Sequence, residues 1–146
     1  MKRGFAQIVA GGMLLAGAGG CTSTWQTAAA DVTPGGWEKP AEIRIENADS
    51  VTLRDADLFL RYDERFTEDT LTVRIATVAP DSLRFEESFL LAIARSDGPA
   101  ALTRECSIPY RSRIRLTRTG EYRFIVTPLR PVRGVEAVGI RLSKSL

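Results

Sequence analysis

The chain has 146 residues, of which 20 are Lys or Arg, 18 are Asp or Glu and none is His. A net charge of +2 gives no basic footprint for nucleic acid. Without histidine, and with two cysteines, a zinc site and a histidine-activated nucleophile both lack their usual residues. We therefore expect a protein that is not an enzyme, holds no metal or cofactor, and does not bind nucleic acid.

Residues 1–20 carry Lys2 and Arg3 ahead of an apolar stretch, which is typical of a signal peptide. The 17 residues from Gly4 to Gly20 fall short of the roughly 20 that a membrane span needs. They lead into Cys21, and AGGC resembles the lipobox of bacterial lipoproteins, in which the cysteine becomes the lipid-modified mature N-terminus. We expect lipidation of Cys21, which anchors a protein through its acyl chains. Ordinary cleavage, leaving Cys21 free or in a disulfide, is the alternative.

Residues 21–36 are predicted to be the lipidated N-terminus and a flexible tether, because TSTWQTAAADVTPGG contains small polar residues, Pro and Gly without sustained periodicity. Residues 37–146 are enough for one domain with one core. Removal of residues 1–20 takes Lys2 and Arg3 away, so the mature 126 residues (146 minus 20) have no formal net charge (+2 minus 2).

From Trp37 onward, apolar and polar residues alternate in short runs separated by turn-forming clusters. In chain order the runs are EIRIEN, DLFLRYD, TLTVRIATV, RFEESFLLAIARS, TRECSIPY, RSRIRL, EYRFIV and VEAVGIRLSK. Residues 89–94 are more continuously apolar, which predicts a strand covered on both sides or central in its sheet. The pattern predicts an all-β fold, a single antiparallel β-sandwich of about seven to eight strands, with a barrel as the competing closure.

Carboxylates and the cysteine of this region offer few catalytic arrangements. Four carboxylates lie in the turn DERFTED: Asp63, Glu64, Glu68 and Asp69. Their spacing does not match an EF-hand loop, so solvated turn charge is favoured over a calcium site. Glu86 and Glu87 are adjacent on a predicted strand, so they point to opposite faces and cannot flank one glycosidic bond. Cys106 is expected to be a small buried residue.

Charge is unevenly distributed along the mature chain. Residues 21–100 hold 8 basic and 15 acidic residues (net −7), and residues 101–146 hold 10 basic and 3 acidic (net +7). The two halves either pair across neighbouring strands, which is favoured, or leave a basic face for an acidic partner. The candidate partner contacts are Arg111, Arg113 and Arg115, which share one face of a predicted strand, and Arg130 and Arg133 in RPVRG. RPVRG itself is interpreted mainly as the connection between the last two strands, where Gly134 frees the chain to re-enter the sheet.

The stretch GEYRFIVTPLRPVRGVEAVGIRLSKS, together with GGW at residues 35–37 and the lipoprotein start, resembles the gliding-motility lipoprotein H family of Bacteroidota. In that family a Trp precedes the first strand, a glycine opens a G-x-Y-x-F strand, and a basic turn leads into G-[IV]-x-x-V-G-[IL]-[RK]. The matching residues are Trp37, Gly120, Tyr122, Phe124, Arg130, Gly134, Val135, Val138, Gly139, Ile140 and Arg141. The chain resembles a divergent member, since it lacks the YPY-like stretch and the G-x-W-x-G turn of the family.

The resemblance implies a non-catalytic outer-membrane lipoprotein, an accessory or assembly component of the cell envelope linked to gliding and its secretion machinery. Its partners would be other envelope, motility or secretion proteins, and its membrane contact the lipid on Cys21. No acidic run follows the cysteine in CTSTWQ, which favours the periplasmic side. A glycan-binding or other ligand-binding β-sandwich lipoprotein is the alternative. Such a module would display clustered exposed aromatics, and the two tryptophans, Trp25 and Trp37, both precede the predicted core.

Overall fold

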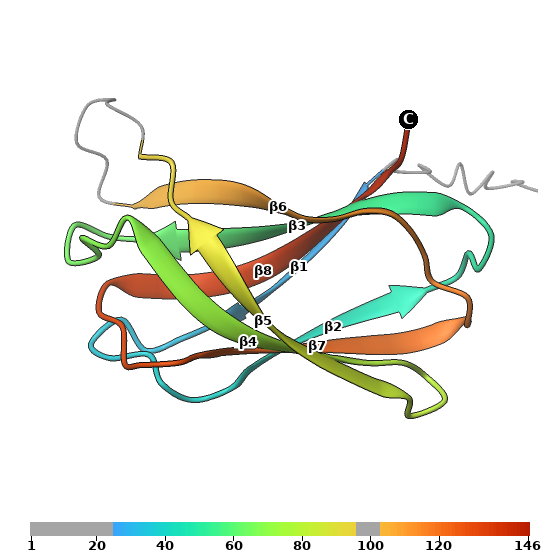
Figure 1. Ribbon diagram of the computed structural model, residues 1–146, viewed down its shortest axis with the longest axis horizontal. Helices are drawn as coiled ribbons and strands as arrows, with labels where there is room; N and C mark the ends of the chain where they lie inside the picture. Colours follow the sequence, from blue (N-terminus) through green and yellow to red (C-terminus); the bar gives the residue numbers. More distant parts are fainter. Residues whose placement is uncertain (1–24, 96–102) are drawn as a thin grey trace, which may run out of the picture.

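The computed structural model describes residues 25–95 and 103–146. Within them lie eight strands: β1 (Trp25–Asp31), β2 (Ala41–Asn47), β3 (Leu53–Tyr62), β4 (Thr70–Val78), β5 (Arg84–Ala92), β6 (Arg104–Arg115), β7 (Gly120–Pro128) and β8 (Val135–Lys144). They form two four-stranded antiparallel sheets, ordered β1-β8-β3-β6 and β2-β7-β4-β5, which face each other (Figure 1). The predicted antiparallel β-sandwich is confirmed.

The core fills the space between the two sheets, as period-two alternation dictates. Strand β2 shows the rule most clearly, because Ile43 and Ile45 are buried whereas Glu42, Arg44 and Glu46 are exposed. The largest fully buried side chains come from both sheets and two connecting segments: Trp37, Tyr62, Phe66, Ile43, Ile45, Leu58, Leu60, Leu71, Ile75, Leu91, Ile140 and Leu142.

The interpretation of residues 21–36 as a tether is wrong for residues 25–31. These residues form β1, which pairs with β8 from Trp25↔Ser143 to Asp31↔Ala137. The inward positions of β1 are Gln26, Ala28 and Ala30, so no large apolar side chain marks its alternation in the sequence; Ala28 and Ala30 are half-buried against the core. Cys21 and the predicted signal peptide lie outside the described residues.

The prediction of a doubly covered or central strand at residues 89–94 is also wrong. Strand β5 lies at the edge of its sheet and pairs with β4. Leu91 faces the core and is fully buried, whereas Leu90 faces outward and is 58% exposed. The continuous apolar run therefore reflects one buried face and one exposed apolar face, a pattern that sequence alone cannot distinguish from burial on both sides.

RPVRG is confirmed as the connection between β7 and β8. Gly134 has a φ of +85°, and a Cβ there would lie 2.2 Å from the backbone nitrogen of Phe66. Trp37 forms an isolated bridge with Val132 and is 2% exposed, so it belongs to the core, contrary to its expected place ahead of it. Beyond the turn, Val138 and Ile140 are buried between the sheets.

The sandwich has two ends, which we call the Trp25 end and the Trp37 end. The Trp25 end, on the right in Figure 1, holds the start of β1, the end of β8 and the loops at residues 48–52, 79–83 and 116–119. The Trp37 end holds the loops at residues 32–40, 63–69 and 129–134. No helix among the described residues could cross a bilayer.

Candidate functional site

Arg111 links the two sheets where their edge strands β6 and β5 face each other. Its guanidinium contacts both carboxylate oxygens of Glu87 and lies over the ring of Tyr110, 5.2 Å from the centroid. The Tyr110 hydroxyl donates to Glu87 Oε1 at 2.5 Å, and its ring meets Phe89 edge-on at 5.1 Å. The hydrogen bond with Glu87 raises the pKa of Arg111, and burial, followed by the contact with Glu87, raises that of Tyr110. These contacts join edge strand β6 of one sheet to edge strand β5 of the other, so Arg111 has a structural role.

The prediction that Arg111, Arg113 and Arg115 share one face is wrong. Two irregularities in the β3–β6 register break the alternation on β6, and Arg113 has a φ of +53°. The Arg113 backbone N–H donates to Asp55 at 2.8 Å, and its guanidinium reaches the carbonyl oxygen of Leu146 at 3.4 Å. Both Arg113 and Arg115 lie at the Trp25 end, and neither has an ion pair among the described residues.

Arg130 and Arg133 lie at the opposite end from Arg113 and Arg115. The Arg130 guanidinium pairs with both carboxylate oxygens of Glu68, with Nη1 3.0 Å from Oε1. This hydrogen bonding raises the pKa of Arg130 and lowers that of Glu68. Arg133 is exposed and has no ion pair within residues 25–95 and 103–146.

Ion pairs join the acidic and basic halves of the chain, but only one of the four among the described residues, Arg123–Glu42, lies on neighbouring strands as the sequence favoured. Four ion pairs join an arginine of the basic half to a carboxylate of the acidic half: Arg111–Glu87, Arg118–Asp81, Arg123–Glu42 and Arg130–Glu68. Most are exposed to solvent, so they contribute little to the free energy of unfolding. Their main consequence is that no large basic face remains among the five predicted arginines.

The other predicted positions are also engaged locally. Asp63 binds the Arg65 guanidinium, which lowers the pKa of the Asp63 carboxyl. Cys106 is buried on β6, and that burial raises the pKa of its thiol. Glu86 and Glu87 point to opposite faces, as predicted, since Glu86 contacts Arg74 and Arg84 rather than Arg111.

The edge of β5 is the first surface that stands out, and sequence reasoning missed it. Its register with β4 runs without a bulge from Thr70↔Ala92 to Val78↔Arg84. No strand among the described residues pairs with its other side. Phe85 and Leu90 are both 58% exposed along this strand. Such an edge presents unpaired backbone groups beside apolar side chains.

The remaining edges are protected. Strand β6 carries Pro109 and two register irregularities, both of which obstruct strand addition. Strands β1 and β2 lie side by side across the sandwich, where Gln26 Nε2 donates to the Glu46 carbonyl at 2.9 Å. The β5 edge is therefore the accessible one on the described part of the fold.

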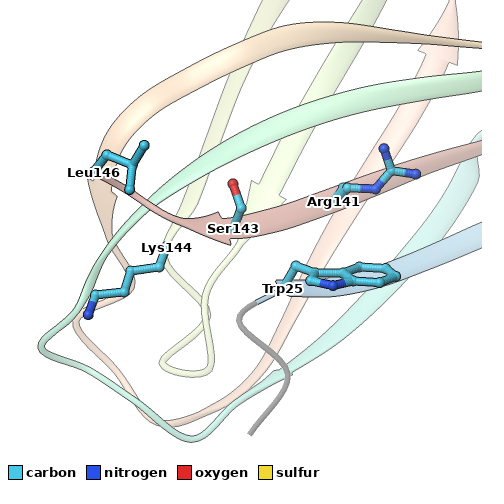
Figure 2. A pocket seen from close by; sticks show the side chains of 5 residues that line it. All are labelled: Trp25, Arg141, Ser143, Lys144 and Leu146. Carbon is cyan, nitrogen blue, oxygen red and sulfur yellow. The ribbon is translucent and has the colours of Figure 1, made fainter.

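The second surface is an open hollow of about 650 Å³ at the Trp25 end, which we call the Trp25 hollow. Its lining residues are Trp25 from β1, Arg141, Ser143 and Lys144 from β8, and Leu146. Figure 2 shows Trp25 on β1 beside Ser143 and Arg141 of the neighbouring strand. The Trp25 side chain is 55% exposed, and the Arg141 guanidinium lies over the ring of Phe59 at 5.4 Å. The lining thus combines apolar side chains with two cations.

Comparison with known proteins adds little to this geometry. No protein-family model matches the sequence, and no curated protein matches it. A solved structure described as a non-crystalline cellulose-specific carbohydrate-binding module, CBM28, is similar over 81% of this chain and 73% of its own, with 9% identity and a TM-score of 0.45. So distant a likeness carries no argument about what this chain binds.

Proposed function

We propose that the protein is a non-catalytic, lipid-anchored envelope protein that binds another envelope protein. In this proposal Cys21 carries the anchor, and the setting is the one that the family resemblance implies: an accessory or assembly component linked to gliding and secretion, facing the periplasm from the outer membrane. The partner supplies an extended segment that adds to the β5 edge.

The exposed edge of β5 carries the proposal. An extended peptide can add a strand to such an edge, with affinity from main-chain hydrogen bonds and specificity from alternate side chains. Nine residues of β5 pair with β4 in unbroken register, which leaves a long, regular edge. Phe85 and Leu90 provide apolar contacts on that strand.

The test is site-specific photocrosslinking in the host cell. A photoreactive amino acid in place of Leu90 should crosslink to an envelope protein, whereas the same residue in place of Leu129 should not. Leu129 is a matched control, because it is 54% exposed but follows β7 instead of lying on β5. The lysine variants are tested in a chain that carries the photoreactive amino acid in place of Phe85. There, Leu90→Lys should lower recovery of the crosslinked partner at least about tenfold, which is the effect of losing one central anchor residue. Leu129→Lys should leave recovery unchanged. Equal recovery with both lysine variants would refute the role of β5.

Strand addition makes a second, independent prediction. With the identified partner bound, the backbone amides of β5 that lack a partner on β4 should gain protection from hydrogen exchange. Protection confined to the Trp37-end loops would place the partner elsewhere and contradict the proposal.

Glycan binding is the second candidate function, and the Trp25 hollow is the observation that favours it. An exposed indole can stack on a sugar, and Arg141 and Ser143 could donate hydrogen bonds to its hydroxyls. Specific binding on a glycan array that is lost in Trp25→Ala would support this function over protein binding. Binding that survives the substitution would exclude the hollow as the sugar site.

A further inference from the structure

We propose that the Trp25 end of the sandwich lies directly on an anionic phospholipid surface, with the Trp25 hollow as its contact. This inference rests on the proposed lipidation of Cys21, and it assigns the protein a fixed orientation in addition to an anchor. The Trp37 end then points away from the membrane.

The chain between the proposed anchor and the fold is short. Three residues, 22–24, separate Cys21 from Trp25. The four steps from one Cα to the other span at most about 14 Å even when fully extended. From Trp25 onward the chain is paired with β8 along all of β1. The linker therefore cannot become longer unless β1 separates from β8. A lipid on Cys21 therefore holds this end of the domain at the membrane surface.

Exposed apolar side chains are concentrated at the Trp25 end of the sandwich. Seven large apolar side chains are exposed among the described residues. Apart from Phe85 on the β5 edge, four of them lie at the Trp25 end: Trp25, Val51, Leu83 and Leu146. Tryptophan and leucine at such positions suit the boundary between headgroups and acyl chains, where an indole finds both apolar and polar surroundings.

The charges at the Trp25 end also suit an anionic surface. The Trp25 hollow is lined by Arg141 and Lys144 and by no carboxylate side chain; Arg141 is paired with Glu105 at 3.3 Å, whereas Lys144 is free of such a contact among the described residues. Arg113 reaches the carbonyl of Leu146 beside it, and Arg115 pairs with Leu53 at the same end. Arg115 and Lys144 have neither an ion pair nor a side-chain hydrogen bond among the described residues, so their charges are available to anionic headgroups.

The tryptophans themselves provide the test. The lipidated protein is reconstituted in vesicles of equal parts phosphatidylcholine and phosphatidylglycerol, with and without brominated acyl chains, which quench nearby indoles. Wild type should lose part of its emission, whereas Trp25→Phe, which retains Trp37 at the far end, should lose almost none. Equal, weak quenching of both proteins would overturn the orientation.

A matched pair of lysine variants tests the charge contribution without the lipid. In the Cys21→Ala chain, Lys144→Gln should weaken binding to these vesicles about fivefold, the contribution of one cation near an anionic surface. Lys39→Gln at the Trp37 end should leave binding unchanged, and equal effects of the two variants would contradict the proposal.

Failure of the anchor and failure of the orientation give different results. Mass spectrometry of the Cys21 peptide reports acylation directly. Acylated protein whose Trp25 is not quenched would overturn the orientation and leave the anchor standing. Absence of the acyl group would refute the lipid anchor and, with it, the proposed orientation. Crosslinking at Leu90 would still decide whether β5 binds a partner.

Discussion

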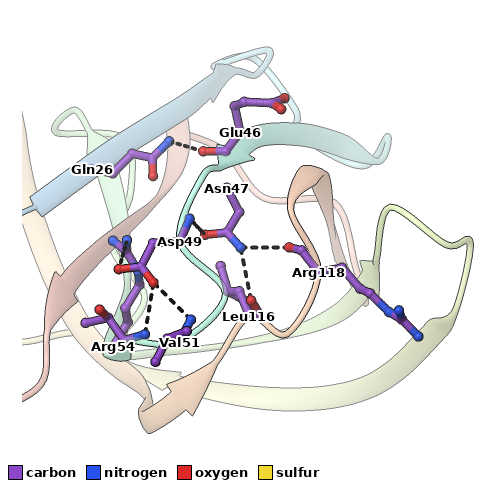
Figure 3. Close-up of polar contacts among 9 residues, drawn as sticks. Gln26, Glu46, Asn47, Asp49, Val51, Arg54, Leu116 and Arg118 are labelled. Atoms are coloured by element: carbon purple, nitrogen blue, oxygen red, sulfur yellow. Dashed lines mark hydrogen bonds and ion pairs between the residues drawn. The ribbon is translucent and has the colours of Figure 1, made fainter.

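Asn47 is a buried polar residue that organises the loops of the Trp25 end, and its replacement gives a sharp prediction. Its side chain is 3% exposed, and Nδ2 donates to the carbonyl oxygens of Leu116 at 3.0 Å and Arg118 at 2.7 Å (Figure 3). These bonds join the end of β2 to the β6–β7 turn. In Asn47→Ala both carbonyls lose their donor, and the one at Leu116 is buried.

The magnitude follows from the two bonds. Each contributes about 1 kcal/mol net, and stranding a buried carbonyl adds about 1 kcal/mol, so Asn47→Ala should lower the free energy of unfolding by about 2–3 kcal/mol. For a domain of this size that corresponds to a fall in Tm of about 10 °C. Urea denaturation followed by circular dichroism measures the change.

Gln26→Ala is the matched control, because Gln26 Nε2 also donates to a backbone carbonyl, that of Glu46, but in an exposed position (Figure 3). Water replaces that bond, so the loss should be no more than about 0.5 kcal/mol. Equal losses in the two variants would refute the reasoning that burial makes the Asn47 bonds costly to remove.

Asn47→Asp extends the test to pH. A carboxylate facing two carbonyl oxygens is disfavoured, so its folded-state pKa should rise above the unfolded value of about 3.9. The variant should then be more stable near pH 4 than at pH 7, because protonation restores a donor. A variant that is instead more stable at pH 7 would contradict this account.

Three further predictions concern other parts of the fold. Gly134→Ala should lower the free energy of unfolding, measured by urea denaturation, by about 2–5 kcal/mol, because φ is +85° and the new Cβ would meet the Phe66 backbone. Gly36→Ala is the control and should change the free energy of unfolding very little, because open space surrounds Gly36. The pKa of Asp49 is lowered to about 2 by hydrogen bonds from the Thr52 hydroxyl and from the backbone N–H groups of Val51 and Thr52. The carboxylate therefore stabilises the fold above pH 3.8, and this stabilisation is lost as the pH falls towards 2. Asp49→Asn should flatten stability over that interval, and an unchanged acid profile would argue against those bonds. Because burial raises the pKa of the Cys106 thiol, the folded Cys21→Ala chain should resist alkylation at pH 8 and react in urea; rapid labelling of the folded chain would show that the thiol is accessible.

The sequence by itself determined the fold class, because alternation with period two and turn-forming clusters are local properties. It also indicated that RPVRG connects two strands and that Cys106 is buried. The opposite net charges of the two halves indicated that they would meet, but three of the four ion pairs join loops or opposite sheets and not neighbouring strands.

Tertiary structure decided which strands lie at the edges and which residues meet. Whether Leu90 is covered depends on the strand that lies beyond β5, and whether Trp25 begins a strand depends on β8, more than a hundred residues away. The bulges that separate Arg111 from Arg113 arise from the β3–β6 register. Both candidate surfaces, the β5 edge and the Trp25 hollow, are made of such long-range relations, which no local pattern in the sequence records.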